Sequence, residues 1–333
     1  MLTALLLAIA MAPTATPNAG LLVGLAYDPG DGIQRQRTLW VTWSDSEPAL
    51  SGNWPILILT HGRDLCRVRI EPVVTERYTF GAFAIQCGSE LEPPVPEPVP
   101  PGCSGERTLS VSFVSPNYVS MEAWEESVCS GKVNSYPDRF VVPVSSFVDH
   151  WRLSPDDESL PVSAVLSADV LEDFQRSARE KCESLNNRDP EELFVRLPDC
   201  RGPLFHDDYT EWTVRRGSGR WDVLAKLAGW RGEVIYYTVP VDLPNSVAPS
   251  QRAHSETPST ATDVLVAPDG RVAALVSADA IKMVVLGAAP EDSPTLVVPK
   301  GSVEEIVMVE WAMGRFATEW SAILKQRFGR GNQ

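Results

Sequence analysis

The chain is short of positive charge, and this shortage excludes one large class of function. Its 333 residues include 29 lysines and arginines against 44 aspartates and glutamates, which gives a formal net charge of −15. A nucleic-acid-binding protein needs a basic face toward the phosphates. An acidic surface is compatible with a basic partner, but it often serves only to keep a protein in solution. We therefore expect no nucleic-acid partner.

Common catalytic motifs are also missing. The chain has neither the GxSxG elbow of serine hydrolases nor a glycine-rich loop ending in GK[ST], and none of its four histidines belongs to an HExxH pair. His206 alone stands beside two carboxylates, Asp207 and Asp208, which could move protons or bind a metal. Adjacent side chains in a turn usually point apart. We expect no metal and no cofactor, and a protein without catalytic activity is favoured over an enzyme.

The six cysteines contain no CxxC pair, so their spacing argues against a metal site and for disulfides. Fifteen pairings are possible. Proximity along the chain favours Cys66–Cys87, Cys103–Cys129 and Cys182–Cys200. Each bond would contribute about 3 kcal/mol in the chain-entropy account. The alternative is that some are buried free thiols.

The first residues resemble an export signal. Residues 2–12 read LTALLLAIAMA, about the length of a signal-peptide core, and the small residues Ala15 and Ala19 follow. No lysine or arginine precedes Arg35, so the usual basic start is absent. We expect residues 1–19 to be cleaved, leaving a secreted or periplasmic protein with no stable membrane span. The alternatives are a wrongly assigned start of the chain or a short membrane anchor, although the run is short for an anchor.

Strand patterns dominate the rest. Apolar residues alternate on both sides of Asp269-Gly270, a strong hairpin signal, and a third strand follows from Ile281. A similar set of strands is expected from Trp212 and Trp221 to Val239. The fold class is α+β and β-rich, with antiparallel sheets and meanders.

Two main helices are expected, at about residues 168–185 and 303–328. Ser167 can cap the first, in which Leu171, Phe174, Ala178 and Cys182 share one face. The second opens with a capping-box pattern, Ser302 to Glu305. Its apolar residues keep a helical spacing, although a strand can precede the helix from Ile306 to Val309.

Prolines crowd residues 93–101, which read PPVPEPVPP. Because proline cannot donate to a strand ladder, this stretch is not a central strand. We expect a linker at 91–102 between a small β-rich domain, 20–90, and an α+β domain, 103–333.

Ten tryptophans are many for this length. Core packing is their usual role, but exposed rings can stack on sugars or anchor a protein partner. Trp40, Trp43 and Trp124 are the candidate binding residues. Trp40 and Trp43 should face opposite sides of one strand, with one of them exposed.

Residues 111–185 carry a resemblance. Tyr118-Val119-Ser120-Met121, then Cys129-Ser130-Gly131 and Ser135-Tyr136-Pro137, resemble a bacterial extracytoplasmic α+β domain. It occurs in lysozyme-sensing anti-sigma factors and as an accessory domain of peptidoglycan deacetylases. The GGAH loop of that domain is replaced here by Gly-Lys-Val-Asn at 131–134, so no ligand role carries over. The resemblance implies a binding module of the cell envelope.

Three functional hypotheses follow. The first is an exported, non-catalytic envelope protein that binds another protein or cell-wall glycan. The second is an envelope hydrolase with its site near His206, Asp207 and Asp208. The third is a structural component of an envelope assembly.

Overall fold

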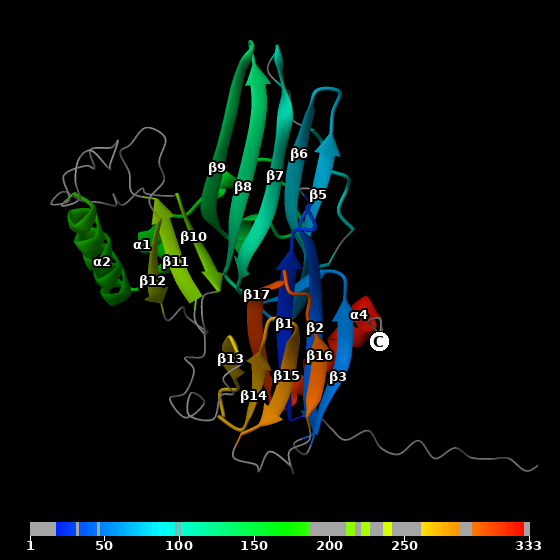
Figure 1. Ribbon diagram of the computed structural model, residues 1–333. Helices are drawn as coiled ribbons and strands as arrows, with labels where there is room; N and C mark the ends of the chain where they lie inside the picture. Colours follow the sequence, from blue (N-terminus) through cyan, green and yellow to red (C-terminus); the bar gives the residue numbers. More distant parts are fainter. Residues whose placement is uncertain are drawn as a thin grey trace, which may run out of the picture.

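The computed structural model describes residues 18–30, 33–44, 47–88, 90–96, 99, 101–186, 211–216, 221–226, 236–241, 261–286 and 295–329 (Figure 1). Over these residues the protein is β-rich, with mainly antiparallel sheets and few helices, as the strand patterns of the sequence predict. None of the described helices is long and apolar enough to cross a bilayer.

One sheet forms the middle layer. Its strands run in the order β17-β1-β2-β3, and all three pairings are antiparallel. Their bounds are β17 Glu305–Met313, β1 Ala19–Tyr27, β2 Arg35–Ser44 and β3 Glu47–Trp54. The apolar run of β1, AGLLVGLAY, is buried at every residue but the last. Such a continuous apolar run is typical of a strand covered on both faces.

The two faces of this sheet contribute to two separate cores. Leu21, Val23 and Trp43 pack into one core, with the smaller sheets and the helix at 168–186. Leu22 and Trp40 pack into the other, with the long sheet and the C-terminal helix. The sheet therefore joins the two cores.

The second sheet has six strands in the order β4-β5-β6-β7-β8-β9. Their bounds are β4 Leu57–His61, β5 Asp64–Val74, β6 Tyr78–Gln86, β7 Cys103–Val114, β8 Tyr118–Cys129 and β9 Lys132–Pro143. The far ends of β7, β8 and β9 project beyond the rest of the molecule (Figure 1).

Strand pairing crosses the predicted boundary at residues 91–102. β6, before the proline-rich stretch, pairs in parallel with β7, after it, and β1 pairs with β17. The stretch thus connects two neighbouring strands of one sheet, where a linker between the predicted domains 20–90 and 103–333 was expected. Prolines suit this parallel connection, because its described residues, 90–96, 99 and 101–102, belong to no strand.

Two smaller antiparallel sheets complete the described strands. One contains β10 Trp212–Arg216, β11 Trp221–Lys226 and β12 Tyr236–Val241; the other contains β13 Asp263–Val266, β14 Val272–Val276, β15 Ala280–Val285 and β16 Leu296–Pro299. The hairpin predicted around Asp269-Gly270 is confirmed, since β13 pairs with β14 and β14 with β15. Gly270 has φ +69°, which glycine adopts without strain.

The described α-helices are α1 Val162–Val165, α2 Ala168–Asn186 and α4 Arg315–Phe328, and two 3-10 helices span Val144–Ser146 and Pro155–Glu158. α2 matches the helix predicted at 168–185. The second prediction, 303–328, is correct only from Arg315 onward, because its first part is strand β17. This strand carries apolar residues on both faces, so their spacing imitates that of a helix. Gly314, at φ +56°, separates the strand from the helix.

Two of the predicted disulfides are present, Cys66–Cys87 and Cys103–Cys129. Cys182 is buried in α2 and is also disulfide-bonded. Its expected partner, Cys200, lies outside the described residues.

Candidate anion-binding cleft

The chain crosses from the middle sheet to the six-stranded sheet at Pro55-Ile56, between β3 and β4. The hydroxyl of Thr38 on β2 fixes this crossing. It donates to the carbonyl of Ile56 at 2.7 Å and accepts from the amide of Ile58 at 2.9 Å. The crossing is therefore anchored to the middle sheet on both sides of the turn.

At this crossing two strand edges are left without a partner among the described strands. The pairing of β2 with β3 begins at Thr38, so β3 does not cover residues 35–37. The pairing of β4 with β5 stops at Val68, so residues 69–74 pair only with β6 among the described strands. An uncovered edge presents backbone N–H and C=O groups that can pair with another chain.

A cleft of about 720 Å³ lies between these edges. Residues 34–37 of the β2 end and 67–71 of β5 line it without interruption. Side chains alternate between the two faces of a strand, so a strand that borders a cavity with one face contributes every second residue. Residues 35–37 and 69–71 of this lining belong to the two edges, whereas Arg67 and Val68 are still paired with β4.

The cleft is basic although the protein is acidic. Four arginines line it, Arg35, Arg37, Arg67 and Arg69, against two carboxylates, Glu71 and Glu304. The net local charge is about +2 from these groups, in a chain of net charge −15. A cleft that collects one sign of charge concentrates ligands of the opposite sign.

Arg37 is held in place by Glu304. Its Nε and Nη2 donate to the two carboxylate oxygens, each at 2.7 Å, and Nη2 also donates to the carbonyl of Pro299 at 2.8 Å. Glu304 accepts a further hydrogen bond from the amide of Gly301 at 2.7 Å. This two-pronged pair shapes one wall of the cleft and neutralises one of its four arginines.

Arg67 and Arg69 lie near aromatic rings. The guanidinium carbon of Arg67 is 6.0 Å from the ring centroid of Phe328 in α4, and that of Arg69 is 5.3 Å from the ring of Trp151. Arg69 also pairs with Glu71 two residues along the strand. A guanidinium stacked on a ring keeps its N–H donors in the plane available for a carboxylate or phosphate.

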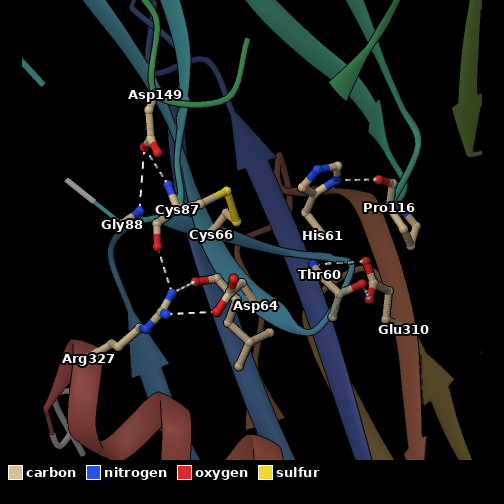
Figure 2. Close-up of a disulfide and its surroundings, with 11 residues drawn as sticks. Thr60, His61, Asp64, Cys66, Cys87, Gly88, Pro116, Asp149, Glu310 and Arg327 are labelled. Atoms are coloured by element: carbon tan, nitrogen blue, oxygen red, sulfur yellow. Dashed lines mark hydrogen bonds and ion pairs between the residues drawn. A yellow bond between two sulfur atoms is a disulfide. The ribbon is translucent and has the colours of Figure 1, made fainter. Parts of the chain in front are cut away.

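The Cys66–Cys87 disulfide adjoins Arg67 and is anchored from two directions (Figure 2). Arg327 of α4 donates to the carbonyls of Leu65 and Cys87 and pairs with Asp64 at 2.8 Å. Asp149 accepts from the amide of Cys87 at 2.9 Å. The part of β5 that carries Arg67 is therefore held by a covalent bond and by α4.

A second polar group lies beyond the disulfide, where β4 ends (Figure 2). The partly buried carboxyl of Glu310 on β17 accepts hydrogen bonds from the hydroxyl and the amide of Thr60. Burial raises the pKa of Glu310 to about 7, and the two Thr60 hydrogen bonds oppose that rise. His61 points elsewhere, to the carbonyl of Pro116 at 3.3 Å. The Glu310 carboxyl and the His61 imidazole are thus hydrogen-bonded to different partners.

The predicted binding tryptophans separate into two kinds. Trp40 and Trp43 do face opposite sides of β2, but both are buried, because both faces of the middle sheet are covered. Trp40 packs on Trp320 and Trp43 on Trp311. The expectation that one of the two is exposed is wrong. Trp124, in the middle of β8, is 47% exposed.

The catalytic candidates His206, Asp207 and Asp208 lie outside the described residues. Within the described part of the chain no three His, Cys, Asp or Glu side chains gather as they would around a metal ion. The four arginines are not among the site residues predicted from the sequence. Their signal is the alternation Arg67-Val68-Arg69-Ile70 within a strand, with Arg35 and Arg37 at the same spacing.

No protein-family model and no curated protein sequence matches this chain.

Proposed function

We propose that this protein is an exported, non-catalytic binding protein of the bacterial envelope, and that it holds an anionic ligand in the arginine-lined cleft. The ligand is a protein partner or a cell-wall glycan that carries carboxylate or phosphate groups. The observation that carries the proposal is the gathering of Arg35, Arg37, Arg67 and Arg69 around one cleft of an acidic protein.

Export is supported by the disulfides and by the start of the fold. Disulfides persist in oxidising compartments and are rare in the cytosol. β1 begins at Ala19, so cleavage of the expected signal at residues 1–19 would leave nearly all of this strand to pair with β2 and β17. The resemblance of residues 111–185 to an envelope domain supports the same compartment.

A binding role is favoured over catalysis by the chemistry of the cleft. Arginine stays protonated at any physiological pH and neither accepts nor releases protons there. The two carboxylates among the lining residues, Glu71 and Glu304, are each paired with an arginine. These groups can recognise and orient an anion, but they do not provide an acid, a base or a nucleophile.

The test is titration calorimetry with anionic probes at low salt: an oligoglutamate peptide, an oligogalacturonate and a polyol phosphate. We expect at least one probe to bind, and its affinity to fall as salt is added. Arg35→Gln combined with Arg67→Gln should weaken that binding at least about tenfold, the effect of about 1.4 kcal/mol. Arg63→Gln, on an exposed arginine outside the cleft, is the matched control.

The proposal fails if none of the probes binds at low salt. It fails equally if the double variant and the Arg63→Gln control bind with the same affinity as the parent protein, because the anion would then sit elsewhere.

A further inference from the structure

We infer that the ligand of this cleft is an extended polypeptide segment with an acidic side chain at every second residue, and that it pairs with the uncovered edge of β5. This inference rests on the proposed function, since it takes the cleft to be an anion site. It adds the class of ligand and the way in which the backbone is recognised.

The edge geometry is the first argument. Residues 69–74 of β5 have one described neighbour, β6, and residues 67–71 line the cleft continuously. Addition of a strand to an open sheet edge is a recurring mode of peptide recognition, in which backbone hydrogen bonds give affinity and side chains give specificity. A glycan can meet the arginines, but it cannot continue the ladder of backbone hydrogen bonds.

The spacing of charge is the second argument. Arg67 and Arg69 are two residues apart on one strand, as are Arg35 and Arg37 across the cleft. Residues two apart on a strand point to the same face, about 6.6 Å from each other. An extended peptide repeats its own side chains at the same interval. Carboxylates at alternate positions would therefore match the arginines.

Pro72 sets a limit on the pairing. It lies on the uncovered part of β5 and has no N–H to donate. Proline on an edge strand shortens the stretch that another chain can pair with, which protects against unspecific aggregation. Of the β5 residues that line the cleft, only 69–71 lie beyond the pairing with β4, which corresponds to about 10 Å of extended ligand. Short segments are therefore the expected ligands.

The experiment compares peptides of identical charge. The parent peptide alternates glutamate with threonine. A second peptide has the same composition with its glutamates grouped together. Two further peptides have the parent sequence with N-methyl groups on alternate residues, one on the odd and one on the even positions. Each of these two blocks the backbone N–H groups along one edge of the extended peptide, so the edge that faces β5 is blocked in one of them.

We expect the parent peptide to bind, and both the grouped peptide and one N-methylated version to bind at least about tenfold more weakly. Amide hydrogen exchange within residues 69–74 should slow when the parent peptide is bound. The oligogalacturonate probe should not slow it.

The outcomes separate the two proposals. Equal binding by the parent, grouped and both N-methylated peptides, with unchanged exchange at 69–74, overturns the strand-pairing inference but leaves an anion-binding cleft. Binding of the oligogalacturonate alone, without any peptide, likewise overturns strand pairing and leaves the anion site. If no anionic probe binds, the proposed function and this inference both fail.

Discussion

The guanidinium of Arg37 contacts both carboxylate oxygens of Glu304 at 2.7 Å, although 267 residues separate the two in the chain. The contact joins β2 to the connection between β16 and β17. The Glu304 side chain is only 8% exposed and that of Arg37 is 21% exposed. One wall of the cleft therefore depends on a nearly buried ion pair between distant parts of the sequence.

Removal of the charge on Glu304 should be costly. Glu304→Gln leaves Arg37 charged and poorly solvated, so we expect a loss of about 3 kcal/mol in the free energy of unfolding, measured in urea. Asp173→Asn is the control, because the Arg176–Asp173 pair has side chains 60% and 62% exposed and should contribute less than about 0.5 kcal/mol. Equal effects of the two substitutions would contradict the structural role of Arg37 and Glu304.

The Cys66–Cys87 disulfide should stabilise the fold and report the compartment. Cys66→Ala with Cys87→Ala opens a crosslink that spans 21 residues, and we expect a loss of about 3 kcal/mol in unfolding free energy. The protein isolated from its native cells should also show no alkylation of these two cysteines without reduction, as measured by mass spectrometry. Free thiols at both positions would count against export.

Glu310 should make stability depend on pH. Its pKa is about 7 in the folded protein and about 4.5 in the unfolded chain, so between these values the folded state binds more protons. The stability that this group contributes should therefore be complete below about pH 4.5, fall as pH rises to about 7, and change no further above that. The full pKa shift corresponds to about 3 kcal/mol of unfolding free energy. Because Glu310 is partly exposed, we expect its contribution to fall by about 1–3 kcal/mol between pH 4.5 and 7.

Glu310→Gln tests this dependence, because the amide oxygen can still accept from Thr60. Urea denaturation gives the unfolding free energy at pH 5 and at pH 8. The difference between these two values should be smaller for the variant than for the parent protein. Glu319→Gln, at an exposed position of α4, should leave the difference unchanged. A variant that keeps the full parental pH dependence would show that another group is responsible.

Truncation of Trp40 should destabilise the fold far more than truncation of Trp124. Trp40 is 1% exposed and packs against Trp320, while its Nε1 donates to Ser321 at 3.1 Å. We expect Trp40→Ala to cost about 3–5 kcal/mol in unfolding free energy. Trp124→Ala removes a ring that is 47% exposed and should cost less than about 1 kcal/mol. Thermal unfolding followed by circular dichroism distinguishes the two.

Local pairings could be predicted from the sequence, and distant ones could not. The hairpin at Asp269-Gly270 and the disulfides at residues 66–87 and 103–129 join neighbours in the chain, where turn chemistry and proximity are sufficient. The pairings of β1 with β17 and of β6 with β7 depend on how sheets assemble in space. No residue pattern near Gly20 or Gly105 indicates either partner.

The cleft could not be predicted from the sequence either, because it also depends on pairings between distant strands. Arg35 and Arg37 precede Arg67 and Arg69 by about 30 residues, and each pair alone is typical of the solvent face of a strand. They meet only because β3 passes to β4 at Pro55-Ile56 and leaves both edges open. Burial of Trp43 was likewise not predictable, because the sequence does not reveal that a second layer covers β2.

The pairing of β1 with β17 has a consequence for the order of folding. Residues 19–26 can pair with β2 as soon as the β1–β2 hairpin forms. They can pair with β17 only after residues 305–313 have been made. Until then the most apolar strand of the middle layer has one bare side, which favours association with other molecules. If the chain is exported as proposed, this side of β1 would stay exposed on the far side of the membrane until residues 305–313 have crossed.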